Sequence, residues 1–301
     1  MSGAIIGAHS YPVCVNNIIG GVVMKLGKPN KLFKNDRYIF ICYNEYINVY
    51  DNLLNHIKKL NVKNAIDMAF TCDYIIARTS IGEVFMYKTN LMEVYGNHKY
   101  GKNICDFFAE FNSNILYISE IDFSCNNSYV HKLNLNSNDF ETLTIKKTCY
   151  ISLYYVENKF LYTMFRDIDN NNSYQQVLNK YNLKPVGIKE IDNSQNVYNR
   201  IDNKFAYFED GFYDYKNNIC LPYCELNLSI DYVIGVKKDV DFYILFAGCK
   251  TNILDSNLNL IKCINAKNIS DWIIDMSVLN DKVIVIYNGY SKVMNKKEFF
   301  G

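Results

Sequence analysis

The stretch from Asn268 to Lys296, NISDWIIDMSVLNDKVIVIYNGYSKVMNK, decides the fold class of this chain. It reads as a strand over Asp271–Val278, an Asn-Asp turn, and a strongly apolar strand over Lys282–Tyr287. An Asn-Gly turn then leads into a third strand over Tyr290–Asn295. Asn, Asp and Gly form tight turns because they tolerate left-handed backbone or bind their own main chain. The pattern is therefore typical of short antiparallel strands joined by hairpins.

Weaker copies of this unit recur towards the N-terminus. Two clear ones begin with NAIDMAF at Asn64 and with NICDFFAEF at Asn103. Turn residues separate short apolar runs at intervals of about 8–12 residues, which is the pattern of an all-β fold. Seven units in 301 residues give 43 residues per unit, close to the ~40–45 of a four-stranded propeller blade. The sequence predicts an all-β fold, a single β-propeller domain over residues 1–301 with seven four-stranded blades, although six or eight blades would also fit.

Two segments leave room for another interpretation. In LLNHIKKLNV, which begins at Leu53, the apolar residues fall at helix spacing. We expect a strand there, because the same place in later units cannot be helical. In the sixth unit, LSIDYVIGV predicts an innermost strand over 228–236, and KKDVD predicts a turn over 237–241.

The two ends of the chain are expected to meet. Residues Ala4–Lys34 contain the short apolar runs AIIGA, YPVCV and GGVVMKL, separated by glycines and polar residues. We expect this stretch to complete the last blade, because Glu298–Phe300 is too short to do so. Closing the ring in this way removes a sheet edge that could otherwise aggregate.

Composition excludes several classes of function. A net charge of +1 gives no basic excess, so we expect no nucleic-acid partner. The densest basic stretch, KLGKPNKLFKNDR over 25–37, is interpreted as a solvated loop, with a phosphate-binding patch as the alternative. No run reaches the ~18 apolar residues of a membrane helix. Ten scattered cysteines without a signal peptide predict free thiols in the cytoplasm, or in the nucleus.

The repeats resemble propellers of the WD40 type in period and in the rhythm of their strands. The diagnostic residues of that family are missing: the single tryptophan, Trp272, lies on the wrong strand, and no Gly-His or Trp-Asp dipeptide occurs. The resemblance implies the architecture and places the chain in no particular family.

An acid recurs early in several predicted innermost strands, next to a large apolar side chain. The candidate residues at the channel mouth are Asp67, Asp106, Asp231, Asp271 and Trp272. Innermost strands line the channel of a propeller, so acids at one depth would form a ring able to hold a cation or a Lys- or Arg-bearing peptide. Alternatively, each acid accepts backbone N–H groups of the neighbouring blade and is purely structural.

Other chemical motifs are weak. Asp167–Asn172 begins like a calcium loop, but it has Asn172 in place of the sixth-position glycine and Leu178 in place of the final glutamate. Cys220 and Cys224 form one C-x3-C without a second ligand pair, which structural zinc requires. No common hydrolase, phosphate-binding or zincin motif occurs. We therefore predict no catalytic residue, no metal and no cofactor.

Three functions fit these observations. The first is a non-catalytic interaction platform or scaffold that binds a protein or peptide partner through propeller loops and rim. The second is a propeller enzyme, or a small-ligand or cation binder, that uses the acids at the central channel. The third is a structural subunit of a larger assembly. The fold alone does not choose among them, because function depends on the site.

Overall fold

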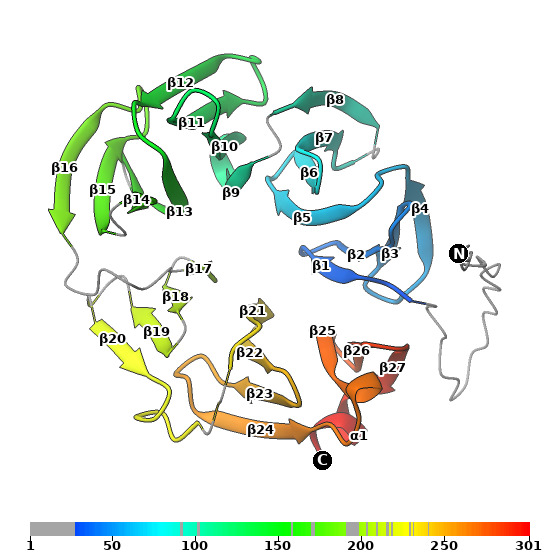
Figure 1. The fold of residues 1–301 in the computed structure, drawn as a ribbon. Coiled ribbons are helices and arrows are strands. Elements are labelled where there is room, and N and C mark those ends of the chain that lie inside the picture. Colours follow the sequence, from blue (N-terminus) through cyan, green and yellow to red (C-terminus); the bar gives the residue numbers. More distant parts are fainter. Residues whose placement is uncertain are drawn as a thin grey trace, which may run out of the picture.

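The structure, a computed structural model, is a ring of seven antiparallel sheets around a central channel (Figure 1). It describes residues 28–301 except 91–92, 101–102, 158, 170–171, 191–198, 203, 209, 215–216, 218, 229, 231 and 240. Within these residues six sheets have four strands and the seventh has three. The expected seven-bladed all-β propeller is confirmed.

The strands follow one another in chain order within every blade. Blade 1 contains β1 (Lys31–Lys34), β2 (Tyr38–Cys42), β3 (Ile47–Asp51) and β4 (His56–Leu60), and blade 2 contains β5 (Ala65–Phe70), β6 (Tyr74–Thr79), β7 (Glu83–Lys88) and β8 (Val94–Lys99). Blade 3 contains β9 (Ile104–Glu110), β10 (Ile115–Asp122), β11 (Asn127–Asn134) and β12 (Phe140–Ile145), and blade 4 contains β13 (Cys149–Glu157), β14 (Phe160–Asp167), β15 (Ser173–Asn179) and β16 (Pro185–Glu190).

Blade 5 contains β17 (Asn199–Arg200), β18 (Phe205–Phe208), β19 (Gly211–Asp214) and β20 (Ile219–Pro222). Blade 6 contains β21 (Gly235–Asp239), β22 (Phe242–Ala247), β23 (Lys250–Leu254) and β24 (Leu260–Asn265), and blade 7 contains β25 (Ile273–Val278), β26 (Lys282–Tyr287) and β27 (Ser291–Asn295). Short helical turns lie at η1 (Phe111–Ser113), η2 (Ile269–Asp271) and α1 (Lys296–Phe300). None of these helices in the described part of the chain has the length and apolar character needed to cross a membrane.

The first strand of each blade is the innermost one and borders the channel (Figure 1). Because every blade is an antiparallel meander, all seven innermost strands begin at the same face of the ring. We call this the entry face. It also carries the turns between second and third strands and the connections from one blade to the next.

The core lies between blades. Side chains of β2 alternate in direction, so that Ile39 joins a buried cluster with Ile286 of blade 7, while Phe40 joins one with Ile75 of blade 2. Second strands are therefore buried on both faces, which explains continuous apolar runs such as YIFIC and VIVI. The packing of blade 1 against blade 7 closes the ring.

Local predictions fared unevenly. LLNHIKKLNV does contain a strand, β4, as expected. The sixth innermost strand was placed wrongly, because β21 covers 235–239 and not 228–236. Leu228 is buried in a loop, and its own N–H donates to the carbonyl of Tyr223. The apolar residue at this position therefore reflects the packing of a loop and not a strand. Residues 4–27, expected to complete blade 7, lie outside the described residues, whereas Lys31–Lys34 form the innermost strand of blade 1.

Candidate functional site

Those predicted site residues that the structure describes lie near the entry-face end of the channel, in blades 2, 3 and 7. Asp67 is in β5 and Asp106 is in β9. Asp271 is the last residue of η2, so it and Trp272 precede the innermost strand of blade 7, whereas the sequence pattern had placed both within it. Asp231 lies outside the described residues. The described acids thus do not occupy equivalent positions.

A β-bulge interrupts three of the innermost strands close to where they begin. In blade 2, Ala65 pairs with Thr79 and Asp67 pairs with Arg78, so Ile66 is the extra residue. Cys105 in β9 and Ile274 in β25 are extra residues in the same way. A bulge turns one side chain out of the regular alternation. An acid follows directly each time, so the equivalent acid of blade 7 is Asp275 and not Asp271.

The acids that follow the bulges bind backbone N–H groups. Asp106 accepts the N–H of Phe107 at 2.7 Å and that of Leu153, in blade 4, at 2.6 Å. Asp275 accepts the N–H of Met276 at 2.8 Å and that of Leu32, in blade 1, at 2.7 Å. Each carboxylate therefore joins its own innermost strand to that of the next blade.

Asp67 reaches the next blade through an arginine. Its Oδ1 accepts the N–H of Met68 at 2.9 Å, and its Oδ2 lies 3.5 Å from Nη2 of Arg78. Nη1 of Arg78 donates to the carbonyl of Ile104 in blade 3 at 3.0 Å. The guanidinium thus bridges blades 2 and 3, as the Asp106 and Asp275 carboxylates bridge their own pairs of blades.

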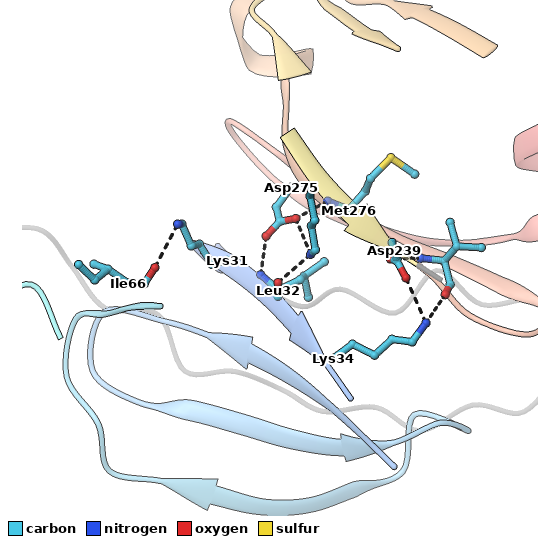
Figure 2. Close-up of polar contacts among 9 residues, drawn as sticks. Lys31, Leu32, Lys34, Ile66, Asp239, Asp275 and Met276 are labelled. Carbon is cyan, nitrogen blue, oxygen red and sulfur yellow. Dashed lines mark hydrogen bonds and ion pairs between the residues drawn. The ribbon is translucent and has the colours of Figure 1, made fainter. Parts of the chain in front are cut away.

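Blades 6, 7 and 1 share a second set of polar contacts (Figure 2). Asp239, at the end of β21, accepts the N–H of Val278 at 2.7 Å and pairs with Lys34 Nζ at 3.2 Å. Lys237 Nζ, from blade 6, lies 2.8 Å from Asp275 Oδ1 and donates to the carbonyl of Leu32. These charges are buried or half-buried, and each lysine among them has a carboxylate partner.

The sequence contained one usable signal for this network. Ile274-Asp275-Met276 repeats Ile66-Asp67-Met68, and that match identifies Asp275 as the equivalent acid. Asp239 had no such signal, because it stood in the segment expected to be a turn.

Among the residues that the structure describes, Asp271 forms its hydrogen bonds within its own part of the chain, just before β25 and in the turn after β26. Its carboxylate accepts the hydroxyl of Tyr290 at 3.1 Å and the side-chain amide of Asn268 at 3.3 Å. Burial, followed by this bond to the carboxylate, raises the pKa of Tyr290 to about 12. Within the described ranges, no three His, Cys, Asp or Glu side chains gather so that they could hold a metal ion. The geometry of these acids is that of links between strands.

Large apolar side chains are exposed on the entry face. They lie at the starts of innermost strands, on turns between second and third strands, or in the connections between blades. Those with the greatest exposure are Ile66, Ile81, Phe123, Tyr150, Ile168, Tyr232, Ile234, Ile269 and Ile274. Both the loops of this face and the channel mouth therefore offer apolar surface to solvent.

The fold and this site define a seven-bladed β-propeller with an apolar entry face. No protein-family model matches the sequence, and no curated protein sequence matches it either. Among solved structures, the fold is similar to that of Kuenenia stuttgartiensis hydrazine synthase, with a TM-score of 0.63 and 10% sequence identity. The match covers 93% of this chain and 99% of that one. At this identity the similarity concerns the fold alone.

Proposed function

We propose that the protein is a non-catalytic interaction platform that binds a protein or peptide partner with its entry face. The observation that carries this proposal is the set of exposed apolar side chains around the channel mouth and on the neighbouring loops. Exposed isoleucine, tyrosine and phenylalanine side chains lose contact with water when a partner covers them, and contiguous apolar surface of this kind marks interaction sites. Aromatic anchors contribute strongly to binding because they bury a large area.

The charges of the entry-face loops support apolar recognition. In the described part of these loops the basic residues are Lys28, Lys63, Lys146, Lys147 and Lys267, and the acidic ones are Glu45, Asp169, Asp210, Glu225 and Asp271. Five charges of each sign leave this described part of the loops without a net charge. A partner is then held mainly by buried apolar area, and its affinity should depend only weakly on salt.

The contacts of the acids favour the platform over a cation binder or an enzyme. Asp106 and Asp275 each use both carboxylate oxygens on backbone N–H groups. A metal ion would have to displace these bonds and weaken the links between blades.

Partner capture with matched variants tests the proposal. The full chain is immobilised and exposed to a lysate of cells that express the protein, and retained proteins are identified, purified and titrated. A Tyr232→Ser, Ile269→Ser variant changes the entry face. A Leu53→Ser, Tyr181→Ser variant changes equally exposed residues in turns on the opposite face.

We expect a retained protein whose affinity falls at least about tenfold with the entry-face variant. The opposite-face variant should bind it unchanged. Equal loss with both variants, or a partner insensitive to the entry-face changes, would contradict the proposal.

A further inference from the structure

Two of the three bulges place an isoleucine at the mouth of the channel. Ile66 and Ile274, the extra residues of blades 2 and 7, are 36% and 44% exposed although they belong to innermost strands. Asp275, beside Ile274, is turned to blade 1, and Asp67, beside Ile66, pairs with Arg78 of its own blade. The exposed extra residues of these two innermost strands border the channel. In each of these two strands the bulge changes the direction of one side chain, so that an apolar group is exposed.

The links between blades put these side chains in a row. The N–H of Leu32 binds Asp275, which sets Lys31 beside Ile274. Nζ of Lys31 in turn donates to the carbonyl of Ile66 at 3.0 Å (Figure 2). Ile274, Lys31 and Ile66 therefore follow one another around the mouth on blades 7, 1 and 2.

Blade 6 extends the row by one residue. Asp239 binds the N–H of Val278, and the two innermost strands run in the same direction from there back to the entry face. Ile234 lies five residues before Asp239, and Ile274 lies four before Val278, so Ile234 stands on the neighbouring strand at least one residue closer to the entry face than Ile274. The N–H of Ile234 binds Phe246 O, which continues the ladder of blade 6. We call Ile234, Ile274, Lys31 and Ile66 the mouth collar.

Lys31 is the one charged member of the mouth collar. The group that accepts its hydrogen bond differs from the groups that face Lys34 and Lys237. Lys34 and Lys237 each face a carboxylate, whereas Lys31 donates to a carbonyl. An ammonium group has three donors. One carbonyl leaves the remaining donors of this exposed side chain to solvent, where a carboxylate would make a shorter and stronger bond.

We propose that the mouth collar recognises a peptide segment in which a large apolar side chain stands next to an Asp or Glu. The apolar side chain packs on Ile234, Ile274 and Ile66, and the acidic one binds Nζ of Lys31. This inference rests on the proposed function and specifies the chemistry of the partner. It differs from the sequence-based hypothesis of a ring of acids that holds a cation or a basic peptide, since the collar is apolar with one positive charge.

Defined peptide pools test the inference with the full chain. Three fluorescein-labelled decapeptide pools, acetylated and amidated at their ends, carry Leu or Phe beside Asp or Glu, Leu or Phe beside Lys, or Ser beside Asp or Glu. Fluorescence anisotropy gives the affinity of each pool. The end caps remove terminal charges, so that any contribution of a carboxylate comes from side chains.

We expect the apolar-acidic pool to bind about two- to fivefold tighter than either of the others, which is the range that an exposed ion pair contributes. Lys31→Glu should reverse the preference between acidic and basic pools, and Ile274→Ser should weaken binding of both apolar pools. Lys63→Glu, on an entry-face connection, and Leu53→Ser, on the opposite face, are the matched controls and should change nothing. Lys31→Met, with thermal melting of every variant, separates loss of charge from loss of fold.

Equal binding of the three pools, no binding of any pool, or a preference that survives Lys31→Glu would overturn the inference. The proposed function is decided separately by partner capture. A captured partner that loses binding with the Tyr232→Ser, Ile269→Ser variant and keeps it with the Lys31 and Ile274 variants would support the proposed function. The same result would contradict recognition by the mouth collar.

Discussion

At the scale of single residues, the acids of the channel differ in what they hold together. Asp275 is 6% exposed and gathers two backbone N–H groups and the ammonium of Lys237. Asp271 binds one hydroxyl and one amide beside solvent. Removing the first leaves buried donors without an acceptor, whereas water can replace the second. Asp275 and Asp271 thus have similar neighbours in the sequence but contribute unequally to the stability of the fold.

Asp275→Ala should lower the free energy of unfolding by about 2–4 kcal/mol, since Lys237 and two N–H groups lose their acceptor. Asp271→Ala, the matched control, should lower it by about 1 kcal/mol or less. Urea unfolding of both variants measures the difference. Equal values for the two would show that the link between blades 7 and 1 contributes nothing special.

A second residue-scale feature is a buried leucine with left-handed backbone. Leu258 has φ 67° and is 2% exposed, and Leu54 in blade 1 repeats it with φ 68°. Asp255 holds the turn, because its carboxylate accepts the N–H groups of Asn257 and Asn259. The side chain tucks into the core between blades and offsets the backbone strain.

The Leu258→Gly variant should therefore be more stable than the Leu258→Ala variant, although glycine is usually the more destabilising of the two replacements. Both lose the buried side chain, which costs about 2–4 kcal/mol. Alanine keeps the left-handed strain of about 1 kcal/mol, which glycine does not have. Thermal or urea unfolding should show the glycine variant as the more stable of the two. The opposite order would mean that the turn changes its backbone once the leucine is gone.

At the scale of elements, the innermost and second strands follow different rules. Second strands such as β26 are buried on both faces, so a continuous apolar run locates them, and Lys282–Tyr287 coincides with the prediction. Innermost strands have no such continuous run to mark their ends. That of blade 7 was expected to begin at Asp271, but Asp271 lies in η2 and the strand begins at Ile273, so the acid was assigned to Asp271 instead of Asp275.

The C-terminal element is a short helix that packs on the last two blades. Glu298–Phe300, which the sequence showed to be too short for a proper strand, belongs to α1. Phe299 is 8% exposed in the cluster between blades 6 and 7, and Phe300 stacks on Phe242 with ring centroids 5.4 Å apart. The helix thus covers the seam between these blades.

Phe299→Ala should lower the free energy of unfolding by about 3 kcal/mol through the cavity it leaves. Glu298→Ala, at the exposed neighbouring position, should change it by about 0.5 kcal/mol or less. Calorimetry or urea unfolding compares them. A small effect of the phenylalanine change would mean that α1 is not part of the cooperative core.

At the scale of the whole molecule, the seams between blades bury many tyrosine hydroxyls. Burial raises the pKa of Tyr87 and of Tyr174 to about 12, and burial with the charge of Glu120 does the same for Tyr100. The folded protein therefore keeps protons that the unfolded chain releases near pH 10. These tyrosines should add no pH dependence below about pH 10, and the stability that they contribute should fall as the pH rises from there towards 12.

Melting temperatures measured between pH 8 and pH 11.5 check this expectation. A Tyr87→Phe variant should lose part of the alkaline sensitivity, because phenylalanine has no proton to release. A melting temperature that stays constant up to pH 11.5 would contradict the raised pKa values.

The sequence by itself determined the fold class, the number of blades to within one, and the place of second strands such as Lys282–Tyr287. These follow from apolar runs and turn residues, which act over neighbouring positions and can be counted along the chain. Only the tertiary structure decided which acids link which blades, where the bulges lie, and that Ile274, Lys31 and Ile66 follow one another on neighbouring blades. Those relations join residues of separate blades, and a one-residue shift in register reverses the direction of a side chain without changing the composition of the strand.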